Sequence, residues 1–355
     1  MGLDIYNTHT LLMAVEQVIK PTTFLRDRYF PTNEVTDVFS TEDVLVEYKN
    51  GLRKLAPFVV PHKGGVAILR GGSYMERYTP PRIAPQRTLT VDDVKKRGFG
   101  EALFTQLTPE QRQLVMIMND IKELDETITR REEVMAAETM LTNGCIMKHI
   151  ADDINLTYDM EIRFYSESTN PSKYTPATKW GQAGAKIIDD INAMIKMLTT
   201  NGLPATDLII SGDVVPIILN DETIQKMLDI RYYNMGMVEP IELPNGASRI
   251  ARINVYGRMI DIISYDETYE NEEGEIVPYI PSGTVILTAP AAGRRVYGAV
   301  NQVEQFDGNI HTYAAARVPK YVSDANQNTR TLTLTSCPLL IPNHKNPWVV
   351  AKVTE

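Results

Sequence analysis

Few residues in this chain have the type and spacing that metal binding requires. Cys145 and His149 lie four residues apart, and on a helix that spacing would direct a thiolate and an imidazole toward one metal ion. The chain has only 5 histidines, and no second pair of ligands lies nearby. We therefore expect an ordinary small apolar cysteine and a surface histidine, and predict no metal site.

The motifs of nucleotide binding and nucleophilic catalysis are also missing. The run Gly181–Lys186 lacks the spacing of a phosphate-binding loop and the Ser or Thr that follows its Lys. Ser211-Gly212 follows Ile210, so it does not match the nucleophile turn of hydrolases. No two carboxylates are marked by their spacing as an acid/base pair. We therefore predict a protein that is not an enzyme and has no cofactor.

The composition is that of a globular protein. The 355 residues are 43% apolar, which is enough for a sizeable core. No apolar run reaches the roughly 18 residues of a membrane span, and the first residues lack the pattern of a secretory signal. Cys145 and Cys337 are the only cysteines, which suits a reducing cytoplasm better than a disulfide framework. We expect no membrane association.

Charge is distributed unevenly along the chain. The net charge is −9, yet residues 51–100 contain ten Lys or Arg and only three acidic residues. Residues 261–275, in contrast, contain seven acidic residues and no basic one. Opposite charges on one chain favour head-to-tail contact between copies. The alternative is a nucleic-acid-binding arm, since Tyr74 and Tyr78 lie among the arginines, although the acidic remainder would repel phosphates.

One long helix dominates the predicted secondary structure. Thr108-Pro109 has the pattern of a helix start and Asn143-Gly144 that of a helix stop, with no Gly or Pro between them. One face carries an apolar stripe formed by Leu114, Ile117, Ile121, Leu124 and Ile128. The opposite face is charged. Either solvent covers it, with weak pairs such as Glu126–Arg130, or a neighbouring chain does.

The other predicted elements are short, and their order indicates an α+β protein without regular βαβ units. Helices are expected at 11–19, within 181–202, at 214–219 and at 222–228. Strands are expected at 44–48, 207–211, within 253–288, and at 311–321, 330–337 and 348–353. Residues 62–90 have little apolar content and are rich in Gly and Pro. A polar loop of this length is usually functional or disordered, and the functional option here is to lie on a partner.

Five stretches resemble the lambda-type major capsid proteins of the phage major capsid protein E family, in the family's order and over nearly the full length. Two lie near the start: Phe24-Leu25-Arg26 with Tyr29-Phe30-Pro31, and Val46-Glu47 with Gly51–Val59. Three lie near the end: Pro278–Pro281 with Gly283–Leu287, Gly293–Gly298, and Arg317–Lys320 with Ser336–Leu340. Each motif alone is weak, but the ordered set is specific.

The resemblance implies the Hong Kong 97-type capsid fold. Residues 1–45 would form an N-terminal arm and residues 46–100 an extended loop region. Residues 101–178 would form a peripheral domain on a spine helix at 108–144, and residues 179–295 an axial domain. Residues 296–355 would return to the peripheral domain.

The resemblance also implies a structural function. Copies of the chain would self-assemble as hexamers and pentamers into the icosahedral shell of a tailed bacteriophage or prophage. The shell would enclose double-stranded DNA without sequence-specific binding. Implied partners are further copies, a scaffold, a portal and a decoration protein. Assembly would take place in the host bacterial cytoplasm, and the product would be the virion capsid.

The charge pattern leads to a prediction of inter-subunit contacts. We expect the basic loop of one copy to lie on the acidic face of the long helix of its neighbour. The residues that would make these contacts are Lys63, Arg70, Arg77 and Arg82 on the loop, and Glu123, Glu126 and Glu133 on the helix.

Overall fold

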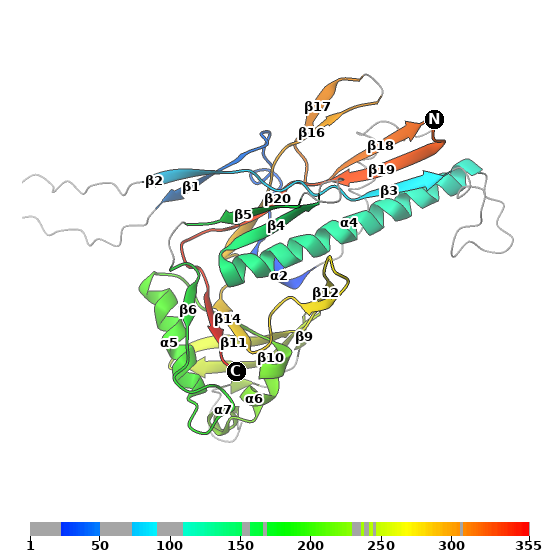
Figure 1. Cartoon of the computed structure of the whole chain (residues 1–355). Helices are drawn as coiled ribbons and strands as arrows, with labels where there is room; N and C mark the ends of the chain where they lie inside the picture. The colour runs from blue at the N-terminus through cyan, green and yellow to red at the C-terminus, as the bar shows by residue number, and fades with distance from the viewer. Residues whose placement is uncertain are drawn as a thin grey trace, which may run out of the picture.

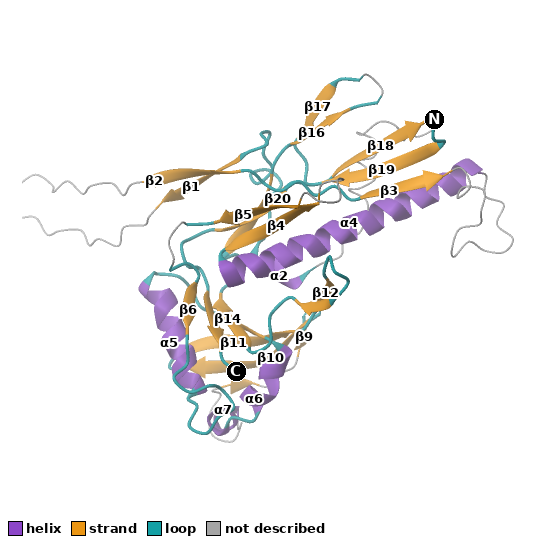
Figure 2. Ribbon diagram, in the orientation of Figure 1, coloured by secondary structure: helices purple, strands orange, loops and turns teal. Residues whose placement is uncertain are grey.

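The computed structural model describes residues 23–49, 73–90, 109–150, 157–165, 169–228, 236–237, 241–243, 246–305 and 308–354. The described residues form an upper part, built on one long helix and several small sheets, and a lower part, built on one large sheet with helices against it (Figure 1). Figure 2 shows helices and strands mixed in both parts, which confirms the predicted α+β class.

The lower part is organised around an eight-stranded sheet. Its central strand β7 (Asp207–Ile210) is buried at every residue and pairs parallel with β11 and antiparallel with β14. This confirms the buried strand predicted at 207–211. The strands run in the order β6 (Ser172–Tyr174), β21 (Val349–Lys352), β14 (Thr284–Thr288), β7, β11 (Arg258–Tyr265), β10 (Ala247–Val255) and β8 (Gly236–Met237), and β9 (Ile241–Glu242) also pairs with β10.

Short helices pack against this sheet. The amphipathic helix predicted within 181–202 is α5 (Ile187–Thr200), whose apolar side is buried against the sheet. A 3-10 turn η1 (Gly212–Val214) leads into α6 (Val215–Leu219). The next helix, α7 (Glu222–Leu228), begins as predicted at Asp221, whose carboxylate accepts the amide hydrogens of Thr223 and Ile224 at 2.9 Å.

The long helix of the upper part is α4 (Pro109–Thr142), with 34 residues. It ends where predicted, because Asn143 adopts the left-handed conformation with φ 62°. Thr108, the expected N-cap, lies outside the described residues. The predicted stripe is buried from Ile117 to Ile128, but Leu114 is 40% exposed and does not belong to it.

Small sheets surround α4. The buried stripe packs against β18 (Val318–Asp324) and β19 (Thr329–Thr335), and β3 (Gln86–Thr90) extends their sheet. The strand predicted at 44–48 is β1 (Val44–Lys49), which forms an antiparallel pair with β2 (Ser73–Tyr78). The other antiparallel pairs are β4 (Gly144–Ile150) with β5 (Thr157–Arg163), β12 (Thr268–Glu270) with β13 (Ile276–Pro278), β15 (Gly293–Tyr297) with β20 (Pro338–Pro342), and β16 (Val300–Val303) with β17 (Ile310–Tyr313).

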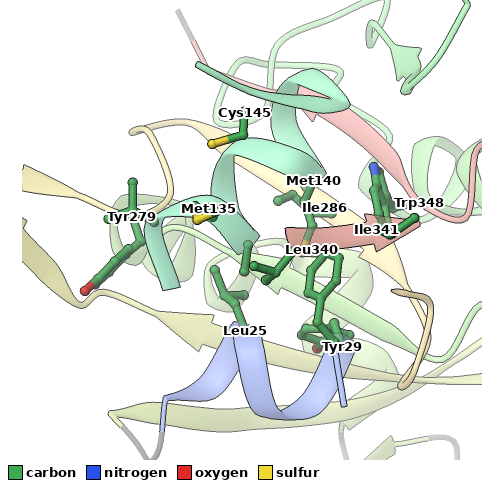
Figure 3. Packing of buried hydrophobic residues seen from close by; sticks show 14 of the residues in the cluster. Leu25, Tyr29, Met135, Met140, Cys145, Tyr279, Ile286, Leu340, Ile341 and Trp348 are labelled. Carbon is green, nitrogen blue, oxygen red and sulfur yellow. The ribbon is translucent and has the colours of Figure 1, made fainter. Parts of the chain in front are cut away.

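A shared core joins the two parts. It contains α2 (Phe24–Tyr29), a short helix in the expected arm that the sequence did not predict. Figure 3 shows Leu25 and Tyr29 of α2 among Met135 and Met140 of α4 and Trp348, which precedes β21. Residues 24–30 are therefore anchored in the core, as their aromatic residues indicated.

Some predicted elements differ from the structure. The single strand expected at 311–321 is interrupted between β17 and β18, because Arg317 turns inward to bond with α4. The strand expected at 348–353 exists as β21, yet it pairs in the lower sheet together with β6. Both strands come from ranges assigned by resemblance to the peripheral domain. The helix expected at 11–19 lies outside the described residues.

Candidate assembly surface

Part of the charged face of α4 is buried: Asp125, Glu132 and Glu133 lie in the interior, whereas Lys122, Glu123 and Arg130 are exposed. Arg317 donates through Nε to Asp125 Oδ1 at 2.6 Å and through Nη1 to Glu132 Oε1 at 2.7 Å. It also donates to Ser336 Oγ at 3.0 Å. Because Arg317 follows β17 while both carboxylates belong to α4, this contact fixes the small sheets to the long helix.

Two further elements bring basic or phenolic groups to Glu132. Arg26 of α2 donates to Glu132 Oε2 at 3.0 Å, and the Tyr297 hydroxyl of β15 donates to Oε1 at 3.1 Å. The guanidinium of Arg295 lies 3.9 Å from the same carboxylate. The guanidinium carbons of Arg295 and Arg317 also lie 5.8 and 5.9 Å from the centre of the Tyr297 ring, within cation–π range.

These cations decide the ionisation of Glu132. Burial alone would raise its pKa, but the charges of Arg317, Arg295 and Arg26 outweigh burial and lower the pKa from 4.5 to about 2. Conversely, burial opposes the charged form of Arg317, yet Glu132 and Asp125 raise the Arg317 pKa. The cluster thus joins α4, α2 and the strands near the C-terminus, and Glu132 is ionised in it at neutral pH.

The neighbouring Glu133 binds the start of α2. Its Oε1 and Oε2 accept the amide hydrogens of Leu25 and Arg26, both at 2.8 Å, and the Tyr265 hydroxyl donates to Oε1 at 2.7 Å. The carboxylate therefore closes the N-terminal end of α2, where unpaired amide hydrogens favour an anion. Burial raises the pKa of Glu133 despite these hydrogen bonds.

The other end of α2 is tied to the lower part. Arg28 Nε donates to Asp207 Oδ2 of β7 at 2.6 Å, and the Tyr29 hydroxyl donates to the same oxygen at 3.1 Å. Because Glu133 holds the start of α2 and Asp207 holds its last turn, this helix bridges the upper and lower parts of the molecule.

The structure corrects the predicted acidic contact residues on α4. Glu133 is 0% exposed and is used within its own chain, so it does not belong to a surface. Glu123 is exposed but accepts a hydrogen bond from Arg87 at 2.5 Å, and Asp120 accepts from the same guanidinium at 2.9 Å. Glu126 is half-buried and pairs with Arg130 at 3.5 Å, the i,i+4 pair expected from the sequence.

The predicted basic contact residues are only partly described. Arg77 lies on the exposed face of β2, where it pairs with Asp43, and Arg82 is exposed in the segment between β2 and β3. Leu45, opposite Arg77 in the register, and the nearby Met75 are exposed on the same face. Lys63 and Arg70 lie outside the described residues. Of the contact residues that the structure describes, Arg77 and Arg82 form no ion pair with Glu123, Glu126 or Glu133 of the same chain.

The residues considered for chemistry lie in ordinary structural positions. Cys145 is buried in β4, not in a helix, and its thiol donates to Glu138 Oε2 at 3.2 Å. Within the described residues, no three His, Cys, Asp or Glu side chains are arranged to hold a metal ion. Gly181–Lys186 forms turns before α5. No helix among the described residues is long and apolar enough to cross a membrane.

A cleft of about 530 Å³ lies between α4 and the β12–β13 hairpin. Arg131 of α4 bridges to Glu272 at the hairpin tip at 2.8 Å. The cleft is lined by charged, polar, aromatic and apolar side chains: Thr127, Arg130, Arg131, Val134, Glu138, Ile146, Tyr269, Glu270, Asn271, Glu272 and Glu273. The acidic segment noted at 261–275 thus ends beside the long helix.

Comparison with known sequences finds similarity along the whole chain. The model of the family described as "Phage major capsid protein E" matches residues 7–353. The P21 prophage-derived major head protein of Escherichia coli strain CFT073 is 24% identical over 358 residues, covering 99% of this chain and 100% of that protein. The major capsid protein of Escherichia phage lambda is 24% identical over 351 residues, covering 96% of each chain.

Comparison with solved structures finds the same overall architecture. A protein from Escherichia coli CFT073 described as a prophage capsid protein superposes with a TM-score of 0.66 at 16% identity, covering 98% of this chain and 99% of that one. A phage-related protein from Bordetella bronchiseptica RB50 gives a TM-score of 0.51 at 10% identity, covering 96% and 95%. At these identities the likeness concerns the fold.

Proposed function

Because the chain belongs to the phage major capsid protein E family, we infer that it is the major capsid protein of a tailed bacteriophage or prophage. It has the Hong Kong 97-type fold, and its copies assemble into the icosahedral shell of the virion, as hexamers and pentamers. The observation that carries this conclusion is the match of the family model to residues 7–353, almost the entire chain.

The mechanism we propose is association without catalysis. The buried Glu132–Arg317 cluster and the anchored helix α2 hold the upper and lower parts of one subunit together. Each subunit can then present its surfaces in a fixed geometry, which a closed symmetric shell requires. The shell encloses double-stranded DNA without sequence-specific contacts, a role compatible with a net charge of −9.

The proposal extends to partners that act on the shell. A scaffold, a portal and a decoration protein are the partners expected for a lambda-type shell, and the host bacterial cytoplasm is the expected place of assembly. The domain ranges given by the resemblance stand as part of this proposal, with residues 1–45 as an arm and residues 46–100 as an extended loop region.

Contact between copies is proposed to use opposite charges. Lys63, Arg70, Arg77 and Arg82 of one copy would approach acidic residues of the next. Glu123 and Glu126 remain on the surface of α4 and can take part, although each already has a basic partner within its own chain. Glu133 is withdrawn from this set because it is buried.

Electron microscopy of the expressed full chain tests the proposed function. We expect closed shells, tubes or capsomer rings in the purified protein, since Hong Kong 97-type subunits carry their own association surfaces. Addition of the phage's own scaffold should increase the fraction of closed shells. A protein that remains monomeric at high concentration, with and without scaffold, would contradict the proposal.

A further inference from the structure

The cleft between α4 and the β12–β13 hairpin leaves apolar side chains open. Ile146 of β4 lines the cleft and is 53% exposed, and Tyr269 of β12 lines it together with Val134 of α4. Ile276 of β13, on the same hairpin, is 77% exposed. Apolar surface that is open to water beside a cleft favours an occupant with apolar side chains of its own.

A row of aromatic rings joins this cleft to the start of α2. The ring centroid of Phe24, the first residue of α2, lies 5.4 Å from that of Tyr265. The centroid of Tyr265 lies 5.9 Å from that of Tyr279, which lies 5.0 Å from that of Tyr269 in the cleft. The chain therefore enters α2 within a few side chains of the cleft.

Contacts of α4 place the start of α2 beside the same part of the long helix. The Glu133 carboxylate accepts the first amide hydrogens of α2. Val134, the next residue of α4, and Arg130, about one turn earlier, both line the cleft. Helix α2 and strand β12 also lie on the same side of α4 (Figure 1). Chain that precedes Thr23 therefore starts next to the cleft.

The segment that precedes Thr23 offers an apolar helix face. Residues 11–19, outside the described part of the chain, are predicted to form a helix, and one side of it would carry Leu11, Leu12, Val15, Val18 and Ile19. A helix of this length is about 13 Å long. Residues 20–22 would join it to Thr23 and can span about 10 Å. A helix on so short a tether stays within reach of the cleft.

We propose that the cleft between α4 and β12–β13 binds the helix predicted at 11–19 of its own chain. The apolar side of this helix covers Val134, Ile146 and Tyr269, and its polar side faces solvent. Since the tether holds the helix beside the cleft, a high effective concentration favours binding within one chain over binding from a neighbour. The proposal concerns a single subunit and does not depend on shell assembly.

Hydrogen exchange of unassembled subunits gives the first test. The amides of residues 11–19 should exchange at least tenfold more slowly than in an isolated peptide of residues 1–22, because docking stabilises the helix. The variant Val15→Asp/Ile19→Asp should lose this protection. The matched control Met13→Asp/Gln17→Asp changes the charge equally on the opposite side of the helix and should keep it. Equal protection in the two variants, or wild-type exchange as fast as that of the peptide, would overturn the proposal.

A substitution in the cleft tests the other side of the contact. Ile146→Asp should increase exchange at residues 11–19, because it puts a charge into an apolar wall. The control is Met160→Asp: Met160 is 44% exposed on β5, but it pairs with Met147 and so lies on the opposite face of the β4–β5 pair from Ile146. Exchange of α5 in the lower part reports whether each variant is folded. Full protection in Ile146→Asp, or equal loss in the control, contradicts docking in this cleft.

Disulfide trapping identifies the occupant. The native cysteines are both buried, so introduced cysteines are the accessible ones. Glu270 lines the cleft and is exposed. On oxidation of unassembled subunits, Glu270→Cys combined with Val15→Cys or with Ile19→Cys should close an internal disulfide, whereas the same changes combined with Met160→Cys should not. If neither pair closes faster than its control, or if the product is a covalent dimer of two chains, the cleft does not hold residues 11–19 of its own chain.

Discussion

Glu132 remains ionised without contact with water because arginine side chains surround it. Its two carboxylate oxygens accept hydrogen bonds from Arg317, Arg26 and the Tyr297 hydroxyl. A buried ion pair loses the hydration of both charges, so its net contribution to stability can be small. Removal of one partner from a buried ion pair costs much more stability, because the charge of the other partner then remains buried without compensation.

Replacement of Arg317 by Leu should therefore destabilise the subunit strongly. Asp125 and Glu132 would stay buried while losing the guanidinium that bonds to both, and we expect the free energy of unfolding to fall by about 3–5 kcal/mol. Chemical denaturation of unassembled subunits measures this change. Arg163→Leu is the control, because its exposed pair with Glu161 contributes at most about 1 kcal/mol. Equal denaturation midpoints for the two variants would contradict the expectation.

The stability of the subunit should also depend on Glu132 in acid. Its pKa is lowered from 4.5 to about 2, so the ionised carboxylate stabilises the folded state above pH 4.5. This contribution, about 3 kcal/mol, is lost as the pH falls from 4.5 toward 2. Glu132→Gln should remove that part of the pH dependence. A variant whose unfolding free energy falls as steeply as wild type over this range would refute the assignment.

At the scale of elements, α2 matters more than its six residues suggest. A helix this short is not stable alone in water, so contacts with other elements must hold it. Glu133 of α4 binds its first amide groups, and Asp207 of β7 binds Arg28 and Tyr29. Helix α2 thus bridges α4 and β7, and its position depends on side chains far away in sequence.

Removal of the Glu133 carboxylate should release α2. In Glu133→Ala, two amide hydrogens and the Tyr265 hydroxyl lose their acceptor, which should cost about 2–3 kcal/mol. Limited trypsin digestion should then cleave after Arg26 or Arg28 faster than in wild type. The control Glu126→Ala, two turns earlier on the same helix, should digest like wild type because it loses only a surface pair. Unchanged protection of Arg26 and Arg28 in Glu133→Ala would exclude this anchoring role.

The sequence predicted those helices and helix ends that depend on residues close together in the chain. The apolar spacing in α5, the stop at Asn143 and the cap at Asp221 depend on residues within one or two turns, and each is confirmed. The apolar spacing in α4 is confirmed except at Leu114. The family resemblance supplied the overall fold. The short helix α2 was missed because its stabilising contacts come from residues about a hundred positions away.

The buried side of α4 was missed for a related reason. A charged face alone does not indicate which basic side chains cover it, and Arg26, Arg295 and Arg317 come from separate parts of the chain. One local signal existed: Val134-Met135-Ala136-Ala137 is apolar around the whole helix, which indicates burial on every side. Glu132 and Glu133, directly before this run, could have been assigned to the interior from it.

At the scale of the whole molecule, opposite charges lie in different places. Residues 51–100 are basic, while the hairpin tip beside α4 keeps unpaired carboxylates. A single exposed ion pair contributes only about 0–1 kcal/mol, so charge contacts between copies become effective through repetition in a closed shell. Such contacts are also screened by salt, and assembly should therefore weaken as ionic strength rises.

Reversal of three basic residues at once tests this view of assembly. The variant Arg70→Glu/Arg77→Glu/Arg82→Glu should block shell formation while leaving the subunit folded, because each copy then presents negative charge to an acidic neighbour. Arg163→Glu/Lys226→Glu/Arg258→Glu is the matched control, with equal charge change at exposed positions of other strands and helices. Sedimentation separates shells from free subunits, and circular dichroism reports folding. Normal shells from the first variant would show that charge in this region does not direct assembly, whereas loss of shells in both variants would point to net charge alone.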